Sequence, residues 1–331
     1  MVLMKAPHES FDDYLVRLFD NKAEYGLTCN DIADLLNKVS GNNFGESAYR
    51  KFYAAFNKGR AYERNKFTGV DKIANRILSI SDLHVPFQLP IETFKDYRGM
   101  VDILVLNGDL IDNHSISKFP KAYRISPMEE IIEGRQYIID LIEYIRPKRV
   151  LATYGNHCVR FQAYMSKHLD ADIAALMPNT VLDLIFDDGF HHYDKRHHTK
   201  SWYEPIKDVF AEQGIEVEYT GNWFCQIGKT IFAHPSAYSS GIMKTAEKAL
   251  TFFKNQGTID FDSIVLGHTH RLGDYTLGEV TIYEQGCCCD VAANNYSNGR
   301  LVTPQTEGYI YVCQDSNGNI VREATKLVRI K

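Results

Sequence analysis

The sequence predicts an α/β fold preceded by a small all-helical module. From about residue 76 onward, short β-rich runs alternate with helical stretches, which indicates a sheet with helices packed on it. The last β-rich runs follow one another without helices, so we expect a mixed sheet with antiparallel pairing near the carboxyl end. We place the boundary between a helical module of residues 1–70 and a larger domain of residues 71–331.

Three segments predict the helices of the N-terminal module. They are "SFDDYLVRLFD", with a serine cap and an acidic first turn, "TCNDIADLLNKVSG", which ends at Gly41, and "GESAYRKFYAAFNKGRAYER". A helix, a short Gly/Asn turn and then a basic helix outline a helix-turn-helix.

The third of these helices interleaves basic and aromatic side chains. They are Tyr49, Arg50, Lys51, Tyr53, Lys58, Arg60, Tyr62, Arg64, Lys66 and Phe67. Such a pattern is typical of nucleic-acid-binding segments, in which cations meet phosphates and rings stack on bases. The alternative is an amphipathic helix that packs on the larger domain with its lysines solvated.

The larger domain contains seven predicted strands and two long helices. The strands are "RILSIS", "DILVLN", "RVLATY", "TIFA", "SIVLG", "VTIYE" and "YIYVC", and the helices cover about Pro127 to Tyr144 and Gly241 to Lys254. The His-rich stretch "DDGFHHYDKRHHTK", residues 187–200, reads either as a solvated insertion loop or as a loop that faces a substrate.

Composition limits the possible classes of protein. The apolar share of 44% and the charged share of 24% are those of a globular protein with a core. The net charge of −5 argues against coating of the whole surface by nucleic acid, but it permits a local basic patch. Because no apolar run is long enough to span a bilayer and the N-terminus lacks an apolar targeting segment, we expect no membrane contact and a cytoplasmic location.

The seven cysteines fit the same location. They are odd in number and irregularly spaced, which suits a reducing compartment better than a disulfide framework. Three of them form the triplet "GCCCD". We interpret it as a strand with small side chains rather than a zinc site, because adjacent residues do not easily converge on one ion.

Five predicted strands end on residues that can bind metals. "RILSI" is followed by Asp82 and His84, "DILVLN" by Asp109 and Asp112, "RVLATY" by Asn156 and His157, "TIFA" by His234, and "SIVLG" by His268 and His270. Sites in open α/β sheets lie at the carboxyl ends of strands, so we expect these side chains to meet.

The donor types indicate the kind of metal. Carboxylates, imidazoles and one amide oxygen suit Mn²⁺, Fe or Zn²⁺ better than Ca²⁺. There are too many donors for one ion, whereas two ions about 3.5–4 Å apart with one bridging carboxylate would use them all. We therefore expect two divalent cations, with Mn²⁺ as the first choice.

The ordered set "DLH", "GDLID", "GNH", "AH" and "GHTH" resembles the calcineurin-like metallophosphoesterase superfamily from about Ile77 to Cys289. The resemblance implies a sandwich of two mixed β-sheets flanked by helices, with a dinuclear site at one edge. It implies that Asp82, His84 and His270 bind the first metal, and that Asn156, His234 and His268 bind the second. Asp109 would bridge the two ions.

The resemblance also implies catalytic roles. His157 would act as a general acid near the leaving group or stabilise charge there. Many relatives place a carboxylate directly after the Asn-His pair, but here that position holds Cys158, so a carboxylate partner for His157 must come from elsewhere. Arg160 and His114 are candidates for substrate contact, and Asp112 either contributes to the site or caps the following segment.

The expected activity is hydrolysis of a phosphodiester by a hydroxide that bridges the two metals. Nucleic acid, most simply DNA, is the first substrate we expect, since "GDLID" resembles the GDL-x-D form of recombination-repair exonucleases in this superfamily. The alternatives are a phosphatase or phosphodiesterase acting on a small nucleotide or phosphoprotein, and a binding protein with a vestigial metal site. A homo-oligomer is compatible with the sequence.

Overall fold

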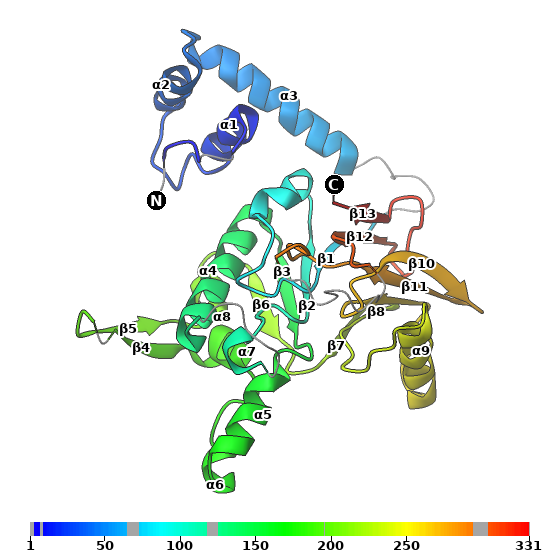
Figure 1. Cartoon of the computed structure of the whole chain (residues 1–331). Coiled ribbons are helices and arrows are strands. Elements are labelled where there is room, and N and C mark those ends of the chain that lie inside the picture. Colours follow the sequence, from blue (N-terminus) through cyan, green and yellow to red (C-terminus); the bar gives the residue numbers. More distant parts are fainter. Residues whose placement is uncertain are drawn as a thin grey trace. The chain divides into compact units, whose positions relative to one another are not determined.

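The structure is a computed structural model that describes residues 3–6, 9–64, 73–117, 125–194, 196–293 and 304–330. The chain divides into two compact units, Met1–Gly69 and Val70–Lys331 (Figure 1). Over the described ranges, no helix combines the length and the apolar character needed to cross a membrane.

The N-terminal unit consists of three helices around one small core. They are α1 (Phe11–Asp20), α2 (Cys29–Ser40) and α3 (Glu46–Arg64). The Ser10 hydroxyl caps α1, and Thr28 and Asp31 form a reciprocal capping box at the start of α2. All three helices contribute to the core, which contains Tyr14, Leu15, Leu18, Ile32, Leu36 and Tyr49.

Part of the predicted basic and aromatic face of α3 is used inside this unit. Tyr49 is only 4% exposed. The Tyr53 hydroxyl donates to Asp20 at 2.6 Å, and Arg60 forms an ion pair with the same carboxylate at 3.3 Å. These three side chains therefore hold the helices together, which corrects the expectation that they all face a partner. Lys66, Phe67 and the side chain of Arg64 lie outside the described residues.

Unit 2 contains a six-stranded sheet in the order β13-β12-β1-β2-β3-β6. The strands span Lys326–Arg329, Gly308–Gln314, Asn75–Ile80, Ile103–Asn107, Arg149–Thr153 and Glu216–Tyr219. Neighbours from β1 to β6 pair in parallel, whereas β12 and β13 are antiparallel. The sheet is therefore mixed, as the sequence predicted.

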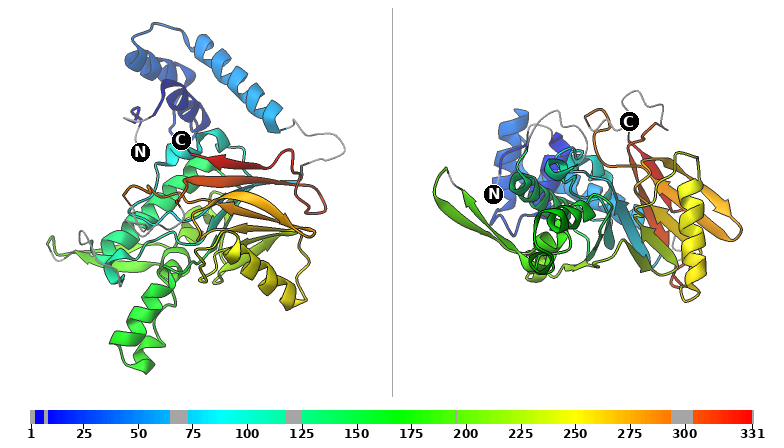
Figure 2. Two further views of the ribbon diagram at one scale, coloured as in Figure 1. Left: turned by 45° about the vertical axis from the view of Figure 1, so that its right-hand side comes forward. Right: turned by 60° about the horizontal axis from the view of Figure 1, so that its bottom comes forward.

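A five-stranded sheet in the order β10-β11-β9-β8-β7 lies against the first. Its strands span Leu272–Leu277, Val280–Gln285, Ser263–Leu266, Thr230–Ala233 and Phe224–Ile227. The central three are parallel, and β10 and β7 are antiparallel at the edges. The two sheets form the expected sandwich, with helices on its outer faces (Figure 2).

Apolar side chains from both sheets fill the space between them. Ile77, Val105 and Ile310 from the first sheet pack in one cluster with Phe232 and Val265 from the second. Helix α9 (Lys244–Gln256) covers the other face of the second sheet with Ala246, Leu250 and Phe253. Helix α4 (Pro127–Ile145) covers the first sheet (Figures 1 and 2). This packing fixes the ends of the strands relative to one another.

The connection between β3 and β6 is long and structured. It contains α5 (Val159–His168), α6 (Ala171–Ala174), α7 (Val181–Asp183), η3 (Leu184–Asp188) and α8 (Ile206–Ala211). It also contains an antiparallel hairpin of β4 (Phe190–Asp194) and β5 (Thr199–Tyr203). The interpretation of residues 187–200 as a loop was therefore wrong: they are mostly a hairpin, which extends from the body of unit 2 (Figure 1).

Two adjacent phenylalanines on α9 test how this helix packs. Phe253 is fully buried in the cluster on the second sheet, whereas Phe252 is 42% exposed. We expect Phe253→Ala to lower the free energy of unfolding by about 3–5 kcal/mol, because it leaves a cavity in the core. Urea unfolding measures this loss. Phe252→Ala is the control and should cost much less, and equal losses would contradict the packing described here.

Candidate metal centre

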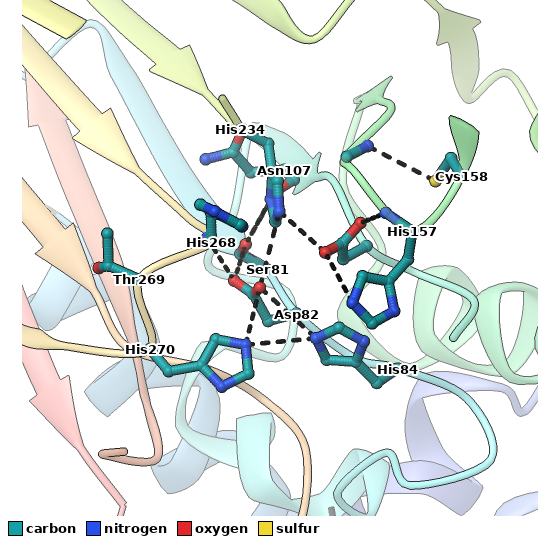
Figure 3. Close-up of polar contacts among 12 residues, drawn as sticks. Ser81, Asp82, His84, Asn107, His157, Cys158, His234, His268, Thr269 and His270 are labelled. Carbon is teal, nitrogen blue, oxygen red and sulfur yellow. Dashed lines mark hydrogen bonds and ion pairs between the residues drawn. The ribbon is translucent and has the colours of Figure 1, made fainter. Parts of the chain in front are cut away.

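Side chains from both sheets converge at the carboxyl ends of five strands (Figure 3). They follow β1, β2, β3, β8 and β9 directly, and they are Asp82, His84, Asp109, Asn156, His234, His268 and His270. Because these strands are parallel to their central neighbours, their ends meet at one edge of the sandwich.

One group of donors contains Asp82, His84 and His270, whose ligand atoms all lie within 4.8 Å of one another. His270 Nε2 is 3.0 Å from Asp82 Oδ1 and 3.2 Å from His84 Nε2. This is the set predicted for the first metal, and the three residues are almost completely buried.

A second group contains Asp109, His234 and His268, again with ligand atoms within 4.8 Å. His234 Nε2 lies 3.0 Å from Asp109 Oδ2 and 3.7 Å from Asp82 Oδ1, so it links the two groups. Asn156 lies next to Asp109, since the backbone N–H of the following residue, His157, donates to Asp109 Oδ1 at 2.8 Å. The bridging role of Asp109 stays a prediction.

Two buried polar atoms indicate that this arrangement fits a cation. Asn156 Oδ1 and His268 Nε2 are buried and make no hydrogen bond to any described residue. An unpaired polar atom away from water costs roughly 1–3 kcal/mol, which a cation would offset by accepting its lone pair. Both atoms belong to residues predicted to bind the second metal.

The backbone around the site is strained where the donors are placed. Five predicted ligands have left-handed φ angles, which are 56° at Asp82, 47° at His84, 48° at Asp109, 73° at His268 and 53° at His270. Such angles are unfavourable for residues with a side chain and gather at functional sites. Gly155 allows the backbone to approach the Asp109 carboxylate closely, because a Cβ there would collide with it.

The two buried carboxylates remain ionised because histidines surround them. Burial raises the pKa of Asp82 and of Asp109, but the nearby charge of His234 opposes it and holds both pKa values below the ordinary range.

The imidazoles of His84 and His268 differ in charge. Burial lowers the pKa of His84, but hydrogen bonds to Asp112 and Asp82 outweigh burial and raise it to about 10. Burial and the charge of His234 lower the pKa of His268 to about 4. His84 would therefore give up a proton on binding a cation, whereas His268 already offers a neutral nitrogen.

Asp112 supplies the carboxylate that His157 was expected to need. Its Oδ1 lies 2.7 Å from His157 Nδ1 and 3.2 Å from His84 Nδ1. On the other side of the ring, Arg160 Nη2 donates to His157 Nε2 at 2.8 Å, and Arg160 Nη1 donates to the Asp112 carbonyl at 2.9 Å. Asp112 is thus part of the site, and Arg160 contacts it directly.

Cys158 packs inside the protein and holds the neighbouring backbone. It is completely buried, and burial raises the pKa of its thiol to about 12. Its sulfur accepts the backbone N–H of Gly155 at 3.5 Å. His114 lies at the rim, with Nδ1 3.5 Å from Asp112 Oδ2 and its ring edge-on to Phe87.

Sequence reasoning missed several residues that orient the donors. The Asn107 carbonyl accepts from His234 Nδ1 at 2.8 Å, and Gln305 Oε1 accepts from His270 Nδ1 at 3.1 Å, which leaves Nε2 of each ring for the site. The Ser81 hydroxyl lies within hydrogen-bonding distance of both the Asp82 carboxylate and the Asn107 carbonyl. Ser81 and Asn107 adjoin the "DLH" and "GDLID" motifs, but no signal in the sequence points to Gln305.

Glu130 on α4 supports the segment that carries Asp112. It is buried, and its Oε1 accepts the backbone N–H of His114 at 2.8 Å. Burial raises the pKa of Glu130 to about 7, although hydrogen bonds from His114 and its neighbours oppose the shift.

Comparison with known proteins gives two matches along the chain. Residues 75–272 match the family described as calcineurin-like phosphoesterase, and residues 1–68 match the YonJ N-terminal domain. The SPbeta prophage-derived uncharacterized protein YonJ of Bacillus subtilis (strain 168) is 38% identical over 58 residues, which are 18% of this chain and 14% of that protein. The match therefore covers only a small part of that relative's length.

Solved structures similar to this chain include an archaeal phosphodiesterase and vacuolar protein sorting 29 of Cryptosporidium parvum. The first is 15% identical, covers 77% of this chain and 99% of its own, and has a TM-score of 0.36. The second is 13% identical, and the match covers 78% of this chain and 99% of that structure's chain, with a TM-score of 0.35.

The raised pKa of Glu130 gives stability a pH dependence. Its ordinary pKa is 4.5 and its folded value is about 7, so its contribution is present below 4.5 and lost as the pH rises through 7. Between pH 4.5 and 7, we expect the free energy of unfolding of Glu130→Gln to rise by about 1–3 kcal/mol relative to that of the wild type. Urea unfolding at several pH values measures this difference. Glu133→Gln, which removes an exposed carboxylate of the same helix, is the control. A difference between Glu130→Gln and wild type that does not change with pH would refute this account.

Proposed function

Since the chain belongs to the calcineurin-like phosphoesterases, which hydrolyse phosphoester bonds with divalent metals, we propose that this protein cleaves phosphodiester bonds in nucleic acid. The observation that carries the proposal is an exposed face of aromatic and basic side chains on the β4–β5 hairpin, in the same unit as the donor groups. A small substrate would not require such a face.

The donor groups fit two divalent cations, with Asp82, His84 and His270 at the first position and Asp109, Asn156, His234 and His268 at the second. When bound, such cations supply Lewis acidity and activate water as the nucleophile. Mn²⁺ is the cation expected from the mixture of carboxylate, amide and imidazole donors.

His157 is the residue we assign to proton transfer. Its Nδ1–H donates to Asp112, which fixes the ring and leaves Nε2 facing Asp109, whose Oδ2 is 3.9 Å away. Burial lowers the pKa of His157, so the ring is neutral when nothing else is bound. Asp112 would stabilise the imidazolium, in which Nε2 can donate a proton to the leaving oxygen.

Arg160 would change partners in the same event. In the structure its guanidinium donates to the lone pair of His157 Nε2. Once Nε2 carries a proton, both groups are donors and cannot remain paired. Protonation of His157 therefore releases Arg160 to bind a phosphate oxygen, which is the substrate contact proposed for it. His114 at the rim is the second candidate for such a contact.

The hairpin offers a surface suited to bases and phosphates. Cross-strand pairing places His191 opposite Trp202 and Tyr193 opposite Lys200, on one face of the hairpin. Trp202 and Tyr193 are 53% and 52% exposed, and His191 contacts the Trp202 ring with centroids 4.7 Å apart. Stacking of a base on such a ring contributes about 1–3 kcal/mol. We call these four residues the hairpin face.

Helix α3 supports the same proposal with fewer residues than its sequence suggested. Of the predicted residues, Arg50, Lys51, Lys58 and Tyr62 are exposed on it, after Tyr49, Tyr53 and Arg60 are used inside the N-terminal unit. The proposed DNA-binding role of residues 1–70 therefore depends on this smaller set. The net charge of −5 favours the alternative, a phosphatase or phosphodiesterase for a small nucleotide or phosphoprotein.

Metal removal tests the reaction class. We expect the purified protein to hydrolyse bis(p-nitrophenyl) phosphate with Mn²⁺, and to lose this activity in EDTA and regain it when Mn²⁺ is restored. His157→Ala should lower kcat by about 10²–10⁴-fold while metal content stays unchanged, because it removes only the proton-transfer group. Full activity after metal stripping would exclude the mechanism.

A substrate panel tests the nucleic-acid proposal. With Mn²⁺ present, we expect faster cleavage of single-stranded DNA than of cyclic nucleotides or p-nitrophenyl phosphate. Trp202→Ala should weaken binding of single-stranded DNA by about tenfold, since one stacking contact is lost.

Hydrolysis of bis(p-nitrophenyl) phosphate by Trp202→Ala serves as the internal control and should match the wild type. Ser201→Ala, on the opposite face of the same strand, is the matched variant and should bind DNA normally. A preference of the wild type for the monoester would favour the small-substrate alternative instead.

A further inference from the structure

The three consecutive cysteines lie beside the metal centre rather than in a strand. The chain leaves β11 at Gln285 and turns at Gly286, whose φ is 82°. It then runs through isolated bridges that pair Cys287 with Glu307 and Cys289 with Gln88. The interpretation of the triplet as part of a strand was therefore wrong, and the turn re-aims these residues toward the donor groups.

Two of the three thiols converge on a predicted metal ligand. Cys287 and Cys289 are separated by one residue, so in extended backbone their side chains point the same way. Their sulfurs and a ring nitrogen of His270 all lie within 4.8 Å of one another, and all three residues are buried. Adjacent residues were not expected to converge on an ion, but the thiols of these alternate residues lie together beside His270.

Cys288 shows what a packing cysteine looks like in the same segment. It is also fully buried, and its thiol lies 3.3 Å from the Gly308 carbonyl, just as the Cys287 thiol lies 3.6 Å from the Thr306 carbonyl. Unlike Cys287 and Cys289, however, it is not part of the group around His270. The middle residue thus faces away from the two outer ones, and it provides a matched comparison for them.

Backbone hydrogen bonds fix this segment to the residues that hold the first donor group. The Cys288 N–H donates to the carbonyl of Ser81, the residue before Asp82, at 3.0 Å. The Cys287 N–H donates to the Thr306 carbonyl at 3.1 Å, and the Thr306 N–H donates to the His270 carbonyl at 2.8 Å. The thiols are therefore held in a defined position relative to Asp82 and His270.

We propose that Cys287 and Cys289 are thiolate donors to the cation held by Asp82, His84 and His270. The two groups share His270, and the thiols would extend one donor set if a cation drew them toward Asp82 and His84, which form a separate group with His270 in the structure. Sulfur donors favour Zn²⁺ or Fe²⁺ over Mn²⁺. Each thiol that binds loses one proton to solvent, so binding at this position releases more protons than a site made of carboxylates and imidazoles alone.

Thiolate donors at the first position would make the two positions prefer different metals. The first position would select a thiophilic cation, whereas the second, with Asp109, Asn156, His234 and His268, contains no sulfur donor and remains suited to Mn²⁺. A mixed pair of metals is therefore expected in a protein exposed to both.

Cobalt substitution tests the proposal by spectroscopy. The full chain is stripped of metal, kept reduced with a phosphine, and loaded with Co²⁺. We expect a thiolate-to-cobalt charge-transfer band in the near ultraviolet for the wild type and for Cys288→Ser. The band should disappear in the Cys287→Ser/Cys289→Ser double variant and weaken in each single variant.

Equilibrium dialysis against equal Zn²⁺ and Mn²⁺, followed by elemental analysis, gives a second measurement. We expect the double variant to lower the Zn²⁺-to-Mn²⁺ ratio by at least about tenfold relative to Cys288→Ser. Circular dichroism confirms that each variant is folded. A cobalt-loaded wild type without the band, or a band that persists in the folded double variant, would overturn the assignment.

The proposed thiolate donors belong to the metal centre on which the proposed function rests, but their binding does not depend on the substrate. The readouts are absorbance and metal content rather than turnover. A protein that shows the band but does not cleave DNA would refute the proposed substrate alone, and active protein without the band would refute the thiolate donors alone.

Discussion

The structure around the site depends on two buried carboxylates, Asp82 and Asp109. Each is almost inaccessible to water, so its charge must be balanced inside the protein. Histidines provide most of the balance, and backbone N–H groups provide the rest. Asp82 accepts from the N–H of His268 at 3.0 Å, and Asp109 accepts from that of His157 at 2.8 Å. Each carboxylate therefore fixes a loop from another strand, and Asp82 joins the two sheets of the sandwich at the edge where the donors meet.

That convergence requires unusual backbone. Left-handed φ angles at five donor residues turn the chain sharply just after a strand, and glycines provide room beside them. A Cβ at Gly108 would collide with the His234 ring, and one at Gly267 would collide with Ser81. The cost of these turns is offset by the sandwich core, in which Phe232 and Val265 pack against strands of the other sheet. The packed sheets are the reason why strained turns persist where the donors are needed.

The sequence predicted the mixed sheets and the converging donors because both depend on local patterns. Asp82, Asp109 and His268 each follow a short β-rich run, so their positions at the strand ends could be inferred. Contacts between distant segments could not. Asp20 binds Tyr53 and Arg60, which are 33 and 40 residues away, and this removes two side chains from the expected binding face. The β4–β5 hairpin was missed because its strands are polar and His-rich, and the thiols were missed because the turn at Gly286 left no periodic signal.

Asp112 couples the two halves of the site more closely than the motifs suggest. A single oxygen, Oδ1, lies near Nδ1 of His84 and near Nδ1 of His157. One ring belongs to the first donor group, and the other is the proposed proton donor. His84 would give up its Nε2 proton on binding a cation, and Asp112 Oδ1 would then lie between a metal-bound imidazole and His157. Because Asp112 faces both rings, metal binding at the first position and proton transfer at His157 would act through the same oxygen atom.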